Sequence, residues 1–91
     1  EFILNDNFPN PFNPQTNISF NIPISGSINL TVYNITGQRV ATLVDGYQHS
    51  GEHNVKWNGL DGSGNQVSSG IYFYSLKMDA STITKSMVLL K

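Results

Sequence analysis

Residues 70–91 read GIYFYSLKMDASTITKSMVLLK, and this stretch decides the fold class. Apolar side chains point to both faces of its first nine residues when these are extended: Ile71 and Phe73 to one face, and Tyr72, Tyr74, Leu76 and Met78 to the other. A strand that is apolar on both faces is typical of one covered on both sides, so we predict a central strand. Residues 81–91 are expected to pair with it across a short turn near Asp79 and Ala80.

Upstream, three further segments alternate apolar and polar residues with the period of two of a half-buried strand. They are NISFNIP at residues 17–23, SINLTVYNI at 27–35 and EHNVKWNG at 52–59. The sequence NITGQ predicts a tight hairpin, because Gly37 can adopt the positive φ that the turn needs. The following RVATLV, residues 39–44, misses strict alternation, so we expect a β-bulge or an early end there.

With a short opening strand at FIL, residues 2–4, these segments make about seven short strands separated by Gly- and Asn-rich turns. No stretch shows a sustained helical period. The pattern predicts an all-β fold, an immunoglobulin-like antiparallel β-sandwich. The Cys…Trp…Cys spacing of antibody domains is absent, so the likeness is architectural. We expect the core to include Ile18, Phe20, Leu30, Val32, Val55, Trp57, Ile71 and Phe73.

The one proline-rich stretch is NFPNPFNPQT, at residues 7–16. Its prolines fix φ near about −65° and bias the preceding residues toward extended conformations. We predict a stiff Pro/Asn-rich N-terminal segment, residues 1–16, leading into a sandwich formed by residues 17–91. Phe8 and Phe12 are expected to pack on the sandwich, and the prolines to keep this edge from pairing with other chains.

Composition excludes several classes of function. The chain has 91 residues, a formal net charge of −1 and only 12% charged residues. It therefore lacks the basic footprint of a nucleic-acid-binding protein and the polybasic patch that attracts anionic lipid. No apolar run approaches the ~20 residues of a membrane span, and the N-terminus does not resemble a signal peptide. We expect a single domain excised from a larger secreted protein, since the sequence does not begin with methionine.

Catalytic chemistry finds little support in the residues present. There is no cysteine, and the two histidines lie near no serine motif. The six carboxylates show no close pair of the kind that glycoside hydrolysis needs. We therefore expect no enzymatic activity and no cofactor.

The loop DGSGNQVSSG, residues 61–70, partly matches a calcium-binding pattern. Asp61, Ser63 and Asn65 offer oxygen ligands at alternate positions, as at the start of an EF-hand loop. The pattern then fails where that loop needs its glycine and its bidentate glutamate. We favour the alternative that Asp61 and Asn65 form turns, with calcium as the weaker hypothesis.

Two patterns could point to carbohydrate. Asn17, Asn29 and Asn34 begin glycosylation sequons, but such matches arise by chance in an Asn- and Thr-rich sequence. Several aromatic side chains could stack on a glycan: Tyr33, Tyr47, Trp57, Tyr72 and Tyr74. Because aromatic residues carry much of the buried area of a small core, we favour core positions for Trp57, Tyr72 and Tyr74.

Four stretches, taken in order, resemble one known family over nearly the whole chain. They are NFPNPFNPQTNISFNIP (7–23), VYNITGQRVATL (32–43), GEHNVKWNGLDGSGNQVSSGIYFYSL (51–76) and KSMVLLK (85–91). Together they resemble the type A C-terminal sorting domain of the type IX (Por) secretion system of Bacteroidetes and their relatives. The third stretch is also similar to the Ig-like domain of the flagellar hook-capping protein. The sequence shows no clear departure from the family pattern, although Thr36 stands where a small apolar residue is frequent.

The resemblance implies a non-enzymatic sorting signal. Such domains direct an N-terminal cargo domain of the same chain from the periplasm of a Gram-negative bacterium through an outer-membrane type IX translocon, to the cell surface or the medium. A sortase-like peptidase commonly removes them. By position, the sorting-signal motif falls on Gly70, Tyr72, Lys85, Met87, Val88, Leu89, Leu90 and Lys91. The PNP of the early motif falls on Pro9, Asn10 and Pro11.

An apolar strand at the chain end fits the hypothesis that the C-terminus itself is the sorting signal. We expect residues 85–91 to carry the recognition determinant, with Lys85 and Lys91 as exposed contacts. Two alternatives stay open. One is a carbohydrate-binding or adhesive module of a surface enzyme, which exposed coplanar aromatics would favour. The other is a structural Ig-like spacer, from which residues 87–91 could be deleted with no loss of export.

Overall fold

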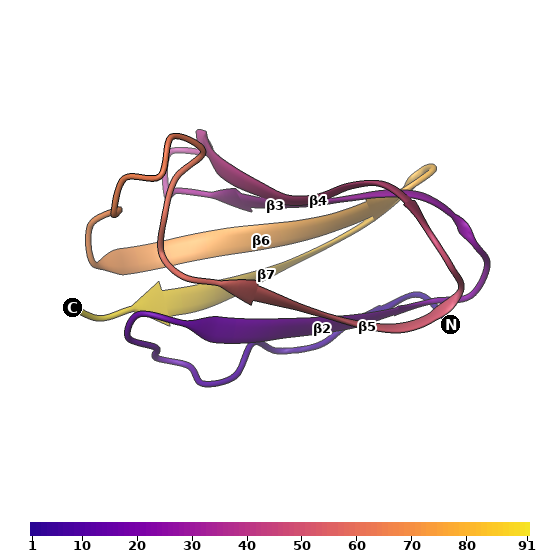
Figure 1. Ribbon diagram of the computed structural model, residues 1–91, viewed down its shortest axis with the longest axis horizontal. Helices are drawn as coiled ribbons and strands as arrows, with labels where there is room; N and C mark the ends of the chain where they lie inside the picture. Colours follow the sequence, from indigo (N-terminus) through magenta and orange to yellow (C-terminus); the bar gives the residue numbers. More distant parts are fainter.

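The computed structural model describes residues 1–91 as two packed antiparallel sheets with no helix (Figure 1). One sheet has the strand order β1-β2-β5 and the other the order β4-β3-β6-β7. The strands are β1 (Ile3–Leu4), β2 (Thr16–Ile22), β3 (Gly26–Tyr33), β4 (Arg39–Gln48), β5 (Gly51–Trp57), β6 (Gly70–Met78) and β7 (Ser81–Leu89). The predicted all-β, immunoglobulin-like sandwich of seven strands is confirmed.

None of these elements is a helix long and apolar enough to cross a membrane.

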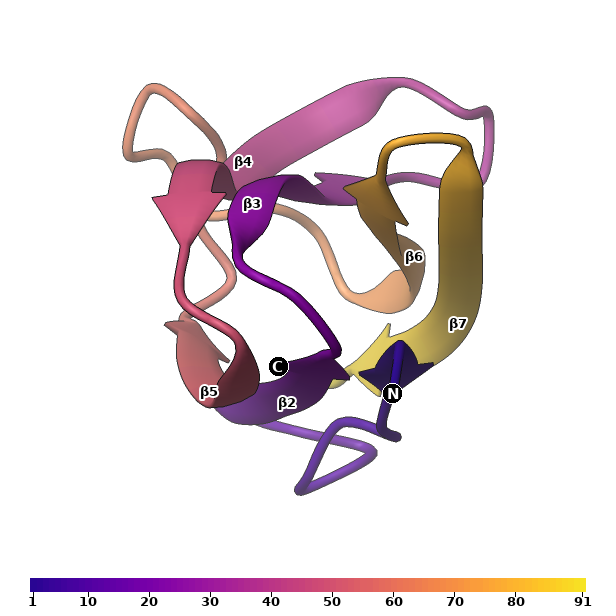
Figure 2. The same ribbon diagram turned by 90° about the vertical axis from the view of Figure 1, so that its right-hand side faces the viewer.

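The core lies between the two sheets, which Figure 2 shows nearly end-on. Five of the predicted core residues are at most 2% exposed: Ile18, Phe20, Leu30, Val32 and Trp57. Val55 is only half-buried, because β5 is an edge strand of the smaller sheet.

The prediction that both faces of β6 are covered was wrong, whereas the core positions favoured for Tyr72 and Tyr74 are confirmed. β6 is central in its sheet, between β3 and β7, but only one of its faces is covered. Tyr72 and Tyr74 point into the core, while Ile71 is 51% exposed and Phe73 half-buried. Alternation could not choose between two apolar faces. The tyrosines can be buried because each hydroxyl donates to a backbone carbonyl at the rim of the core, Tyr72 to Ser68 at 2.6 Å and Tyr74 to Asn5 at 2.8 Å.

The β3–β4 hairpin forms at the predicted turn. Gly37 has a φ of 85°, and the Asn34 side chain accepts hydrogen bonds from the backbone N–H groups of Thr36 and Gln38 at 3.0 Å. The predicted bulge is also confirmed, because the register shifts twice between these strands. The early end is not: β4 continues to Gln48 and stays paired with β3.

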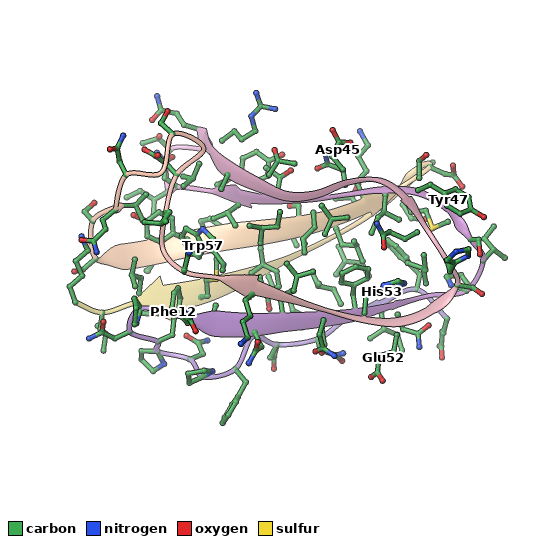
Figure 3. The ribbon with its side chains drawn as sticks, in the orientation of Figure 1. Phe12, Asp45, Tyr47, Glu52, His53 and Trp57 are labelled. Carbon is green, nitrogen blue, oxygen red and sulfur yellow. The ribbon has the colours of Figure 1, made fainter.

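The N-terminal segment is attached to the sandwich, but through only one of the two predicted phenylalanines. Phe12 is 2% exposed, and its ring centroid lies 5.8 Å from that of Trp57 (Figure 3). Phe8 is 77% exposed. In its place the neighbouring Asn7 is buried, with Nδ2 donating to Thr16 Oγ1 at 3.0 Å and to the Pro9 carbonyl at 3.2 Å. Adjacent residues of an extended segment point in opposite directions, so burial of Asn7 turns Phe8 outward.

Candidate functional site

The residues predicted as a sorting signal come together in one hairpin. β6 and β7 pair so that Gly70 lies opposite Leu89 and Tyr72 opposite Met87. Met87 and Leu89 are fully buried in the core, whereas Val88 is half-buried and Leu90 is 51% exposed. The apolar run at the chain end therefore divides by alternation into a core half and a surface half.

The N-terminal segment covers the outer edge of β7. The Phe12 N–H donates to the Val88 carbonyl at 3.0 Å, and the Phe12 carbonyl accepts the Leu90 N–H at 2.9 Å. The Val88 N–H donates to Oδ1 of Asn10 at 3.0 Å. The structure thus joins the PNP motif, through Asn10, to the C-terminal motif. The local sequence patterns did not predict this contact between residues 10–12 and the end of β7.

Lys85 is less exposed than predicted. Its side chain is only 34% exposed, and Nζ lies 3.0 Å from Oδ1 of Asp6 in the N-terminal segment. Lys91 is exposed, as expected. Of the two predicted lysines, Lys91 can contact a partner directly, whereas Lys85 would first have to break its ion pair with Asp6.

A buried tyrosine also ties the N-terminal segment to the larger sheet. Tyr74 donates from its hydroxyl to the Asn5 carbonyl at 2.8 Å. Burial raises the pKa of Tyr74 to about 12, because the phenolate would lose its hydration. The negative charge of Asp6 adds to this rise, and a hydrogen bond from the Asn7 backbone opposes it.

Asp61 forms the turn predicted for the acidic loop. Its Oδ1 accepts the backbone N–H groups of Ser63 at 2.9 Å and of Asn65 at 3.0 Å. No three of the histidine, aspartate and glutamate side chains gather at one place in the structure. Calcium binding by the loop stays an untested hypothesis.

Three of the five aromatic candidates are too buried to stack on a glycan. Trp57, Tyr72 and Tyr74 lie in the core, and the Trp57 indole N–H donates to the Leu60 carbonyl at 2.9 Å. Tyr47, on β4, is exposed but distant from that cluster (Figure 3). This burial counts against the carbohydrate-binding alternative.

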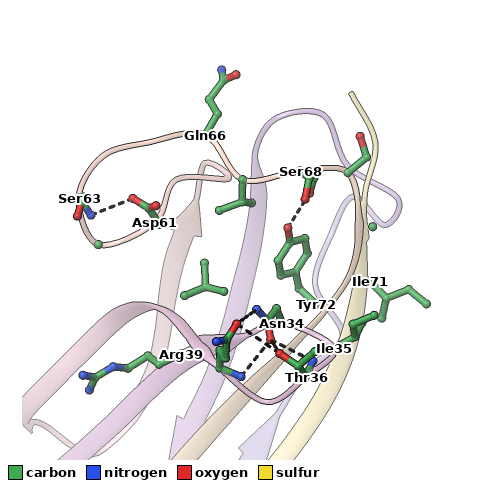
Figure 4. Close-up of a pocket in the computed structure, with 16 residues that line it drawn as sticks. Asn34, Ile35, Thr36, Arg39, Asp61, Ser63, Gln66, Ser68, Ile71 and Tyr72 are labelled. Carbon is green, nitrogen blue, oxygen red and sulfur yellow. Dashed lines mark hydrogen bonds between the residues drawn. The ribbon is translucent and has the colours of Figure 1, made fainter.

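A hollow of about 780 Å³ lies between the β3–β4 turn and the loop that joins β5 to β6 (Figure 4). Ile35, Ile71, Arg39 and Asp61 are among the residues that line it. Ile35 was not among the functional candidates that the sequence patterns indicated. The sequence could have indicated it, because Ile35 is an isoleucine inside a polar hairpin turn. A side chain in that turn does not reach the core, so it stays on the surface.

The family described as the FlgD Ig-like domain matches residues 9–83. The solved structure of FlgD from P. aeruginosa is similar, with 28% identity and a TM-score of 0.62, over 81% of this chain and 59% of that chain. No curated protein matches the sequence.

Two further solved structures share the fold. One is PorZ, described as an essential bacterial surface component of the type-IX secretion system of Porphyromonas gingivalis, with 19% identity and a TM-score of 0.64. The other is dimeric latent PorU from the same organism, with 20% identity and a TM-score of 0.74. Each similarity covers 99% of this chain, but only 11% of the PorZ chain and 9% of the PorU chain. The chain therefore corresponds to a small part of each.

Proposed function

The chain belongs to the FlgD Ig-like domain family, and within that family we propose that it is a non-enzymatic C-terminal sorting signal of the type IX secretion system. It directs an N-terminal cargo domain from the periplasm across the outer membrane, to the cell surface or the medium. A sortase-like peptidase then removes it. The partners are the outer-membrane translocon and this peptidase.

The proposal rests on how the last three residues of the chain, Leu89 to Lys91, are buried or exposed. Leu89 is only 1% exposed, so β7 is held firmly by the core. Leu90 and Lys91, directly after it, are exposed. A strand that is fixed on one side and accessible on the other presents its last residues in a defined position, as a receptor-read signal requires.

Two further observations support the proposal. The fold is shared with PorZ over 99% of this chain, and PorZ is itself described as a type-IX secretion component. The two ends of the chain also lie at opposite ends of the 37 Å long axis (Figure 1). Cargo joined at the N-terminus would leave the C-terminal end uncovered.

A structural Ig-like spacer is the second candidate, favoured by the match to the FlgD Ig-like family. Deletion of residues 87–91 does not separate the two candidates. It removes Met87 and Leu89 from the core, so a loss of export could reflect unfolding alone. Changes restricted to the exposed Leu90 and Lys91 avoid this problem.

The test is to place the domain at the C-terminus of a periplasmically targeted fluorescent reporter, in a host with type IX machinery. We expect the reporter in the medium, and retention in the periplasm when the domain or the translocon is missing. The mass of the released reporter checks removal, since cleavage takes away the 10.0 kDa domain. A reporter that keeps a folded domain and stays in the periplasm of the competent host would contradict the proposal and favour the spacer.

A further inference from the structure

The outer face of the larger sheet, which no other element covers, changes in character along its length. Cross-strand pairing places side chains in rows on this face. At one end the rows are polar: Asp45, Asn29 and Lys77 in one, and Thr42, Thr31 and Ser75 in the next. At the other end, where β7 stops, they become more apolar: one row has Tyr33 and Phe73 between Arg39 and Ser86, and the next has Ile71 and Val88.

The apolar rows continue into a partly exposed surface that we call the outer-face patch. Its residues are Tyr33, Ile35, Phe73, Ile71 and Val88, with the exposed Leu90 on the same side as Val88 by alternation. Ile71 lies directly opposite Val88, and shares the hollow of Figure 4 with Ile35, which is 72% exposed. Single exposed apolar residues are ordinary on a protein surface, but a contiguous group marks an interaction site.

The structure leaves only this face for contact with the end of β7. The inner face is core, through Met87 and Leu89. The backbone edge is taken, because Phe12 and Asn10 bond the polar groups of Val88 and the Leu90 N–H. A partner that added a strand at this edge would have to displace the N-terminal segment. The side chains of Val88 and Leu90, with Ile71 beside them, need no displacement.

The charges around the outer-face patch are cationic. Arg39 borders it in the row of Tyr33, and Lys91 follows Leu90. The only ion pair of the domain joins Lys85 to Asp6, so neither cation is neutralised. Asp61 lines the neighbouring hollow, but its carboxylate already accepts two backbone N–H groups. The surface that would complement the patch is apolar at its centre and carries carboxylates at its border.

We propose that the outer-face patch is the surface by which the secretion machinery recognises this domain, through an apolar protein site bordered by carboxylates. The inference rests on the proposed sorting function and makes it more specific. Recognition extends beyond β7 to the β3–β4 turn, through Ile35, and to β6, through Ile71. It does not involve pairing of backbone at the β7 edge.

The experiment uses the reporter fusion with substitutions on the patch. Ile71→Thr and Val88→Thr keep the β-branched shape that suits a strand and introduce a polar hydroxyl. Ile24→Thr is the matched control, because Ile24 is 62% exposed in the β2–β3 turn, at the opposite end of β3. We expect export to fall about tenfold for each patch variant, as for loss of an interface hot spot, and to be unchanged for the control. Melting temperatures should stay within about 3 °C of the wild type.

A charge reversal tests the border of the patch. Arg39→Glu should lower export, while Lys77→Glu, on the same face but in the polar row, should not. Full export of the folded Ile71→Thr and Val88→Thr variants would overturn the inference while leaving the sorting function intact. Retention of the wild-type fusion would instead reject the function itself. If sedimentation shows that the domain dimerises and Ile71→Thr makes it monomeric, the occupant is a second copy and the inference is wrong.

Discussion

Phe12 and Leu89, near opposite ends of the chain, lie side by side as a parallel β-bridge. The Phe12 backbone is bonded to the residues on both sides of Leu89, and the two side chains enter the same core. The N-terminal segment therefore acts as an additional edge of the larger sheet. It also closes the β7 edge, which would otherwise offer unpaired backbone groups to another chain.

Phe12→Ala should destabilise the domain by about 3–5 kcal/mol, because it removes a fully buried ring from contact with Trp57. Urea denaturation followed by tryptophan fluorescence measures the change. Phe8→Ala is the control, since the same residue type in the same segment is exposed and should change stability by less than about 0.5 kcal/mol. Equal losses from the two variants would contradict the arrangement described here.

Leu89→Ala and Leu90→Ala should separate folding from recognition. The first creates a cavity in the core and should cost about 2–5 kcal/mol. The second removes an exposed side chain and should change the melting temperature little, while lowering export of the reporter. Melting curves and export yields of both variants check this. A folded Leu90→Ala variant that is exported fully would mean that this residue is not read.

Lys85→Ala and Asp6→Ala should behave alike, because each breaks the same ion pair between β7 and the N-terminal segment. Asp6 is largely exposed, so each loss of stability should be about 0.2–1 kcal/mol and should shrink as salt is added. Export of the two variants should also match. If Lys85→Ala alone blocked export, the lysine itself would be recognised.

Stability should fall between about pH 10 and pH 12 because of Tyr74. Its pKa is raised to about 12 in the folded state from an ordinary 10.0, so the unfolded chain loses this proton first. The contribution is complete below pH 10 and reaches a loss of roughly 2–3 kcal/mol above pH 12. Tyr74→Phe should lose about 1 kcal/mol at neutral pH, with its hydrogen bond to Asn5, and show a smaller alkaline loss. Parallel alkaline curves for the two proteins would reject this assignment.

Calcium should leave the melting temperature nearly unchanged, because Oδ1 of Asp61 is already bonded to two backbone N–H groups. Titration with calcium, with magnesium as the control, tests this in a thermal scan. A rise that grows with calcium concentration, as linkage requires, would reveal a site in the loop. Asp61→Ala should lower the melting temperature whether or not calcium is present, since the turn loses both hydrogen bonds.

Local sequence patterns were enough to predict several strands and one turn of the fold. Alternation identifies β2, β3 and β5, because a strand with one buried face must repeat with a period of two. Gly37 identifies the hairpin turn, since a positive φ is cheap only for glycine. The dense apolar run at residues 87–90 indicates a final strand, and alternation alone predicts that its residues divide between the two faces.

Other features were decided only by the tertiary structure. Both faces of β6 are apolar, so only the position of the second sheet selects Tyr72 and Tyr74 for burial over Ile71 and Phe73. Phe8 and Phe12 each lie directly between an asparagine and a proline. Nothing in that shared context indicates that Phe12 is in the core and Phe8 exposed. The contacts of Asn10 and Phe12 with Val88 depend on how the chain closes on itself. Such long-range pairing sets which surfaces are covered, and a local pattern carries no information about it.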